Sequence, residues 1–132
     1  MKILIAYDGG EPGKRALETG VRLAKATGAT IDIVSVVPVH PGRSPIDPWD
    51  DPTIHRTLLS EAQQVVREAG FEAQLLEPSG DPAQTIERIA QDGEYDMVVV
   101  GSRGLGAVSR FLQGSVSEHV ATHAKTTVVV AR

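Results

Sequence analysis

Short runs of apolar residues alternate along the chain with longer stretches in which apolar residues recur every three or four positions. The short runs cover residues 2–7, 30–37, 71–77, 96–100 and 126–131. Runs of this length, bounded by glycine or proline, are typical of β-strands, and the three-to-four spacing is typical of amphipathic helices. The alternation of the two predicts βαβ units, and therefore an α/β fold of about five parallel strands with helices on both faces.

Four helices are predicted between the strands. The first begins near Pro12 and ends at Gly28, and the third begins at Asp81-Pro82, because proline fits the first helical turn, where its missing N–H is not needed. The second follows the loop that ends at residue 52, and the last spans about residues 115–124. The residues expected on the buried faces are Leu17, Val21 and Ala24 in the first helix, Leu58, Ala62, Val65 and Ala69 in the second, and Ile86, Ile89 and Ala90 in the third.

Two strands and one loop stand out by their pattern. Residues 71–77 alternate apolar and polar residues, which suits a half-exposed edge strand, whereas residues 96–100 are apolar without alternation, as in a central parallel strand. Residues 39–52 hold four prolines and the only tryptophan, Trp49. Long loops of this kind are either lids over a ligand or plain connections, and the sequence leaves both interpretations open.

Composition restricts the function further. The chain has 132 residues, which suits one domain over residues 1–132. Its formal net charge is -4 and it has no run of lysine and arginine, so we expect no nucleic-acid partner. It has no cysteine, which excludes disulfides and thiolate metal sites. The first apolar run is too short for a signal peptide or a membrane span, so a cytoplasmic protein without a membrane partner is expected.

Candidate chemistry collects where two strands end. In open parallel sheets, ligands bind beyond the carboxyl ends of the strands, and here one strand ends at Asp8 and another at Gly101. The glycines between 101 and 114 can expose backbone N–H groups to an anion, and the helix after Gly114 adds the positive end of its dipole. Arg103 and Arg110 can supply positive charge. This segment therefore predicts a phosphate-binding cradle.

A purely structural interpretation of these residues is also open. Ser115 and Glu118 fit a capping box, in which both side chains bond to the first N–H groups of the helix. Aspartate between a strand and glycines, as at Asp8, commonly makes a local turn. His119 and His123 are four residues apart but lack a third ligand, so they are interpreted as ordinary helix residues. The other two histidines, at positions 40 and 55, flank the proline-rich loop without an evident partner.

The glycine-rich segment resembles that of a known family. The pattern G-x2-G-x9-G-[ST] of the nucleotide-binding universal stress proteins is matched by Gly101, Gly104, Gly114 and Ser115. The resemblance covers the whole chain, from Tyr7-Asp8-Gly9 after the first strand to His123-Ala124 before the last one. The sequence departs from many relatives at Lys125-Thr126, where a Cys-Pro pair is common, and this departure affects the entry to the last strand, not the phosphate site.

The resemblance implies a Rossmann-like sheet with strand order 3-2-1-4-5, ATP bound with Mg²⁺, and homodimers paired through residues 126–131. In such proteins the aspartate that matches Asp8 lies near the ribose or the metal-linked phosphates. The backbone of the residue that matches Val36 meets the adenine edge. The other residues of the implied ATP site are Ala6, Gly101, Arg103, Gly104, Gly114, Ser115 and Val116.

The motifs and the family resemblance are compatible with three functions. The first is a nucleotide-binding regulatory or stress-response protein in which ATP biases conformation or dimerisation. The second is a slow ATPase or phosphotransfer enzyme that uses the same site, and the third is an interaction module of the same fold that binds no nucleotide. The first is preferred, because no general base for attack on the γ-phosphate is recognisable and no catalytic residue is assigned.

Overall fold

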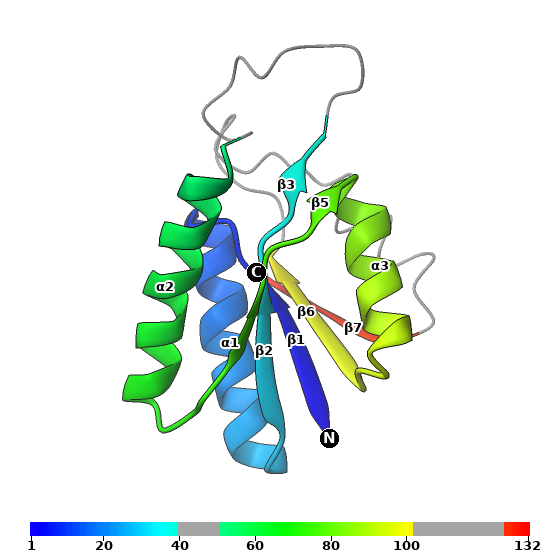
Figure 1. Ribbon diagram of the computed structural model, residues 1–132. Coiled ribbons are helices and arrows are strands. Elements are labelled where there is room, and N and C mark those ends of the chain that lie inside the picture. Colours follow the sequence, from blue (N-terminus) through cyan, green and yellow to red (C-terminus); the bar gives the residue numbers. More distant parts are fainter. Residues whose placement is uncertain (40–50, 102–125) are drawn as a thin grey trace.

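The computed structural model describes residues 1–39, 51–101 and 126–132 of the chain (Figure 1). Its central sheet consists of β1 (Lys2–Ala6), β2 (Thr30–Val34), β4 (Gln74–Leu76), β6 (Met97–Gly101) and β7 (Thr127–Ala131). Two short strands, β3 (Val37–Pro38) and β5 (Ser79–Gly80), form a second small sheet beyond the carboxyl ends of β2 and β4. The described helices are α1 (Glu11–Thr27), α2 (Pro52–Glu68) and α3 (Pro82–Asp92).

The strands of the central sheet lie in the order β4-β2-β1-β6-β7, and every neighbouring pair is parallel. This confirms the predicted α/β class and, with the strands of this sheet counted along the chain, the order 3-2-1-4-5. β1 lies in the middle because the chain passes from β1 to β2 on one side and later enters β6 on the other side. The edges of the sheet are the short strand β4 and the five-residue strand β7.

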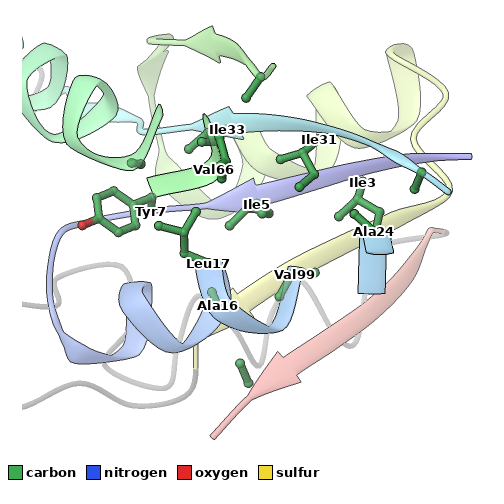
Figure 2. Packing of buried hydrophobic residues seen from close by; sticks show 14 of the residues in the cluster. Ile3, Ile5, Tyr7, Ala16, Leu17, Ala24, Ile31, Ile33, Val66 and Val99 are labelled. Atoms are coloured by element: carbon green, nitrogen blue, oxygen red, sulfur yellow. The ribbon is translucent and has the colours of Figure 1, made fainter. Parts of the chain in front are cut away.

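Apolar side chains cover both faces of the sheet and follow the alternation of residues in β1. Ile3 and Ile5 point toward α1 and α2, where they pack in one cluster with Leu17 of α1 (Figure 2). Leu4 points to the opposite face, into the cluster that contains Ile86 of α3. Figure 1 shows the resulting layers, with α1 and α2 on one side of the sheet and α3 on the other.

Aspartates fix the first residues of two helices. Asp51 caps α2 by accepting a hydrogen bond from the N–H of Thr53 at 2.9 Å, and Asp81 caps α3 by accepting one from Gln84 at 3.0 Å. In both helices a proline follows the cap directly. A side-chain cap of this kind stabilises a helix by about 1 kcal/mol. The predicted start at Asp81-Pro82 is confirmed.

The predicted buried face of α2 is wrong in part. Val65 is 46% exposed. The buried residues of this helix are His55, Leu59, Ala62 and Val66. Apolar residues occur in adjacent pairs at positions 58–59 and 65–66, so two stripes, offset by one residue, fit helical spacing equally well. Packing against the sheet selects the later stripe, and local periodicity could not distinguish the two.

Two of the strands are shorter than predicted. Residues 30–37 divide into β2 and β3, and the strand predicted at 71–77 is reduced to Gln74–Leu76. The helix predicted at 115–124 lies outside the described residues, and so does most of the proline-rich loop, including Trp49. None of the helices in the described part of the chain is long and apolar enough to cross a bilayer.

A polar cluster ties the strands together near their amino ends. The hydroxyl of Tyr95 donates a hydrogen bond to Oδ2 of Asp32 at 2.6 Å. Nζ of Lys2 lies 4.4 Å from the centre of the Tyr95 ring and donates to the carbonyl oxygen of Gly93 at 2.6 Å. Burial, and secondly the hydrogen bond to Asp32, raises the pKa of Tyr95 above its ordinary value. This cluster lies at the end of the sheet opposite the candidate site.

Candidate functional site

The carboxyl ends of β1 and β6 form a topological switch point. The two strands are neighbours, but α1 leads from β1 to β2 on one side, whereas α3 leads into β6 on the other side. Open α/β sheets bind ligands in the crevice at such a point. Ala6 ends β1, Asp8 follows it by two residues and Gly101 ends β6. The fold therefore brings these three residues to one edge of the sheet.

Asp8 is a buried acid at the start of α1. It is 2% exposed, and its Oδ1 accepts a hydrogen bond from the N–H of Gly10 at 3.0 Å. Gly10 is the N-cap of α1, and its N–H, at the positive end of the helix dipole, donates to the Asp8 carboxylate. This hydrogen bond is the local turn that was one of the two interpretations of Asp8 from the sequence. It leaves a ligand role open as well, because a carboxylate has about four acceptor positions.

The first turn of α1 is packed tightly between Asp8 and the end of β6. A side chain at Gly13 would place its Cβ 2.6 Å from Oδ1 of Asp8, and one at Gly101 would place its Cβ 2.6 Å from Cβ of Pro12. Carbon atoms in ordinary contact are about 3.5–4.0 Å apart, so neither side chain fits without movement. Helix packing alone therefore requires glycine at position 101, which adds a structural role to the phosphate-facing role predicted from the sequence.

Val36 lies between β2 and β3, and the residues around it fix the direction of its backbone. The N–H groups of Ser35 and Val37 donate to carbonyl oxygens at the end of β4 and just beyond it, at 3.0 and 2.8 Å. Successive residues of a strand direct their N–H and C=O groups to opposite neighbours. The N–H and C=O groups of Val36 therefore point toward the β1 side of the chain. The N–H of Tyr7 donates to the carbonyl oxygen of Val34 at 3.0 Å, and Val36 lies two residues beyond this bond. Asp8 follows on that same side.

α2 contributes a second buried polar group near this edge. His55, close to the start of α2, is fully buried, and its Nδ1 lies 2.7 Å from Oγ of Ser35, which is also fully buried. The sequence shows no evident partner for His55, and the structure corrects this. The signal was absent because the two residues are 20 positions apart and only the packing of α2 on the sheet joins them.

Two acidic residues, Asp8 and Glu61, act on the hydroxyl of Tyr7 near this edge. Burial, with smaller contributions from the charges of Glu61 and Asp8, raises the pKa of Tyr7 above its ordinary value. A polyphosphate bound here would need a cation to offset these carboxylates. Within the described residues, no group of three or more histidines and acids is placed to hold a metal.

The remaining residues of the predicted site lie outside the described part of the chain. They are Arg103, Gly104, Gly114, Ser115 and Val116, and the same holds for His119 and His123. Their roles stay predictions.

The strand order defines the class of doubly wound, Rossmann-like α/β folds, in which ligand sites generally lie at the carboxyl edge of the sheet. Comparison with known proteins narrows this class. The model of the universal stress protein family matches residues 1–132. The chain belongs to the universal stress protein family.

Individual relatives agree with this assignment. The "Universal stress protein in QAH/OAS sulfhydrylase 3'region" of Thermus aquaticus is 34% identical over 139 residues, which cover 98% of this chain and 97% of the relative. A universal stress protein solved in complex with cAMP has a TM-score of 0.78 at 23% identity, over 100% of this chain and 97% of the other. One from Archaeoglobus fulgidus, in complex with dAMP, has a TM-score of 0.74 at 23% identity, over 100% and 98%. At this identity the two structures show a shared fold.

Proposed function

We propose that the protein binds an adenine nucleotide at the carboxyl edge of β1, β2 and β6, and that the nucleotide acts as a regulatory ligand in a stress response. The observation that carries the proposal is the buried Asp8 carboxylate at the switch point, on the side toward which the backbone of Val36 is directed. The ligands of the two similar structures, cAMP and dAMP, support the same class of ligand.

The backbone of Val36 suits the base of such a nucleotide. Its N–H and C=O groups offer one donor and one acceptor on the same side of the chain. Adenine presents a complementary pair, because its ring nitrogen N1 accepts and its N6 amino group donates a hydrogen bond. Guanine presents an acceptor and a donor in the reverse arrangement at these positions. The same two peptide groups would therefore favour adenine over guanine.

Asp8 suits the sugar or the metal-linked part of the ligand. A carboxylate accepts hydrogen bonds from ribose hydroxyls and is a preferred ligand of Mg²⁺. ATP with Mg²⁺ is the form that we expect, since the cation would offset the negative charge at this edge. The further contacts that we assign to the ribose and phosphates are those of Ala6, Gly101, Arg103, Gly104, Gly114, Ser115 and Val116.

We also propose a cytoplasmic homodimer of the single domain 1–132, paired through β7. This strand lies at the edge of the central sheet, and its three valines, at positions 128 to 130, are only partly buried. An unpaired apolar edge is an aggregation risk, and pairing with a second copy would remove it.

Titration calorimetry with AMP, and with ATP in the presence and absence of Mg²⁺, tests the binding proposal. Micromolar affinity corresponds to about 8 kcal/mol of binding free energy and is readily measured. The informative variant is Asp8→Asn, because an amide oxygen can still accept the bond from Gly10 while the charge is removed. We expect Mg-ATP to bind at least about tenfold more weakly, since a bond to a charged group contributes about 1.5–3 kcal/mol.

A matched control is Asp96→Asn. Asp96 accepts a backbone hydrogen bond from Lys2 at 2.7 Å, at the opposite end of the sheet, so this change should leave the affinity unaltered. Absence of heat with every adenine nucleotide at millimolar concentration would refute the proposal. If wild type and Asp8→Asn bound Mg-ATP with equal affinity, Asp8 would not contribute to binding.

A further inference from the structure

Ser35 and His55 form a buried polar pair beside the apolar cluster that lies between the sheet and the helices α1 and α2. Both are fully buried, and Oγ of Ser35 lies 2.7 Å from Nδ1 of His55. Their neighbours in sequence that face the same core are apolar, namely Ile33 of β2 and Leu59 of α2. The hydrogen bond between Ser35 and His55 therefore joins the carboxyl end of β2 to the start of α2.

Stability alone gives little reason for such a pair. A buried hydrogen bond makes a small net contribution to folding, because both groups lose their bonds to water. Apolar side chains of similar volume are often equally stable at buried polar positions. A buried hydrogen bond does, however, restrict the relative placement of the two elements that carry it. Its contribution is geometric, and it acts on the backbone next to Ser35.

That backbone is the segment that leads into Val36. The N–H of Ser35 donates to Leu76 at 3.0 Å, and the N–H of Val37 donates to Pro78 at 2.8 Å. These two bonds fix the segment in the plane of the sheet. The bond between Ser35 and His55 fixes it from the face that α2 covers, so the peptide groups of Val36 are held from two directions.

We propose that His55, acting through Ser35, is a positioning residue that sets the discrimination between adenine and guanine at the backbone of Val36. This proposal rests on the proposed nucleotide-binding function. One N–H and one C=O can select between the two bases only if both groups stay aligned with the edge of the base. A small rotation of the peptide would weaken the hydrogen bonds to adenine and would also reduce the repulsion of guanine. His55 prevents that rotation without contacting the ligand.

Three variants test the proposal. His55→Leu and Ser35→Ala each remove the hydrogen bond, whereas His55→Asn keeps a polar atom near the position of Nδ1 and serves as the rescue. Calorimetry with AMP and GMP gives the ratio of the two dissociation constants for each protein. We expect the preference for AMP to fall about tenfold in His55→Leu and in Ser35→Ala, which is within the range for one bidentate contact to a base. His55→Asn should retain most of the preference.

Tyr95→Phe is the matched control. It deletes a side-chain hydrogen bond of similar length, that of Tyr95 to Asp32 at 2.6 Å, at the other end of the sheet. It should lower stability by an amount similar to that of Ser35→Ala and leave the base preference unchanged. A general loss of stability is thereby separated from a loss of positioning.

Amide hydrogen exchange in the absence of nucleotide gives a second readout. In His55→Leu the amides of Ser35 and Val37 should exchange faster relative to core amides of β1, because a local restraint is lost. An unchanged base preference in His55→Leu and Ser35→Ala, together with unchanged exchange at these two amides, would overturn this proposal alone. Wild-type protein that binds no adenine nucleotide would overturn the proposed function and this proposal with it.

Discussion

Replacing Gly101 with alanine tests whether the end of β6 serves mainly for packing of α1 or mainly for contact with a ligand. The added Cβ would lie 2.5 Å from the carbonyl carbon of Pro12 and 2.6 Å from its Cβ. Carbon contacts are relaxed at about 3.5–4.0 Å, so the first turn of α1 would have to move away from the sheet by about 1 Å. A backbone atom cannot rotate away as the end of a long side chain can.

The expected loss of stability is about 2–3 kcal/mol. Overpacking of a dense interior costs about 1–3 kcal/mol, and an obstacle of backbone atoms places this change at the upper end. Alanine also lowers the conformational entropy of the unfolded chain relative to glycine, which stabilises the folded state by about 0.4–1 kcal/mol. Urea denaturation followed by circular dichroism measures the result. With a slope of about 2 kcal/mol per molar urea, the midpoint should fall by about 1 M at unchanged slope.

Gly28→Ala provides the control for this experiment. Gly28 ends α1 with a φ of 73°, and a Cβ built there meets nothing within 4 Å. Alanine at this position suffers only the cost of the left-handed conformation, about 1–2 kcal/mol. A Gly101→Ala protein that is as stable as wild type would refute the packing argument. Glycine at this position would then be explained by the ligand alone.

Three further predictions concern the site, the polar cluster and the assembly. Gly13→Ala should weaken nucleotide binding about tenfold, because the new Cβ displaces the Asp8 carboxylate, and calorimetry should find no such effect in an Asp8→Ala background. Tyr95 has a pKa raised above the unfolded value of about 10, so its contribution to stability is complete below about pH 10 and is lost as the pH rises toward the folded pKa. Urea midpoints measured up to about pH 11 should therefore fall less steeply in Tyr95→Phe than in wild type, and equal slopes would contradict this. Light scattering after size exclusion should give twice the 14.0 kDa of one chain, whereas a mass of 14.0 kDa would contradict the dimer.

Local patterns in the sequence predicted most of the elements of the sheet. The apolar runs located the strands, and Asp81-Pro82 located the start of α3, because caps and strand propensity depend on residues that are close in sequence. The strand order 3-2-1-4-5 came from the family resemblance, not from the pattern, and the structure confirms it. The placement of Asp8 and Gly101 at one edge followed from the rule that parallel strands end on the same side.

Contacts between distant elements could not be predicted in this way. Two stripes of apolar residues on α2 had the same helical spacing, and only packing on the sheet placed Val66 inside and left Val65 46% exposed. The bond between Ser35 and His55 depends on the same packing.

Gly101 shows where the sequence by itself was sufficient and where it was not. The sequence determined that a glycine follows a buried strand at the edge where ligands bind, because strand ends and glycines are local features. Only the tertiary structure decided that this glycine lies against Pro12 of α1. The reason is physical: whether a side chain fits depends on atoms that the fold brings close from elsewhere in the chain, and the residue alone does not encode them.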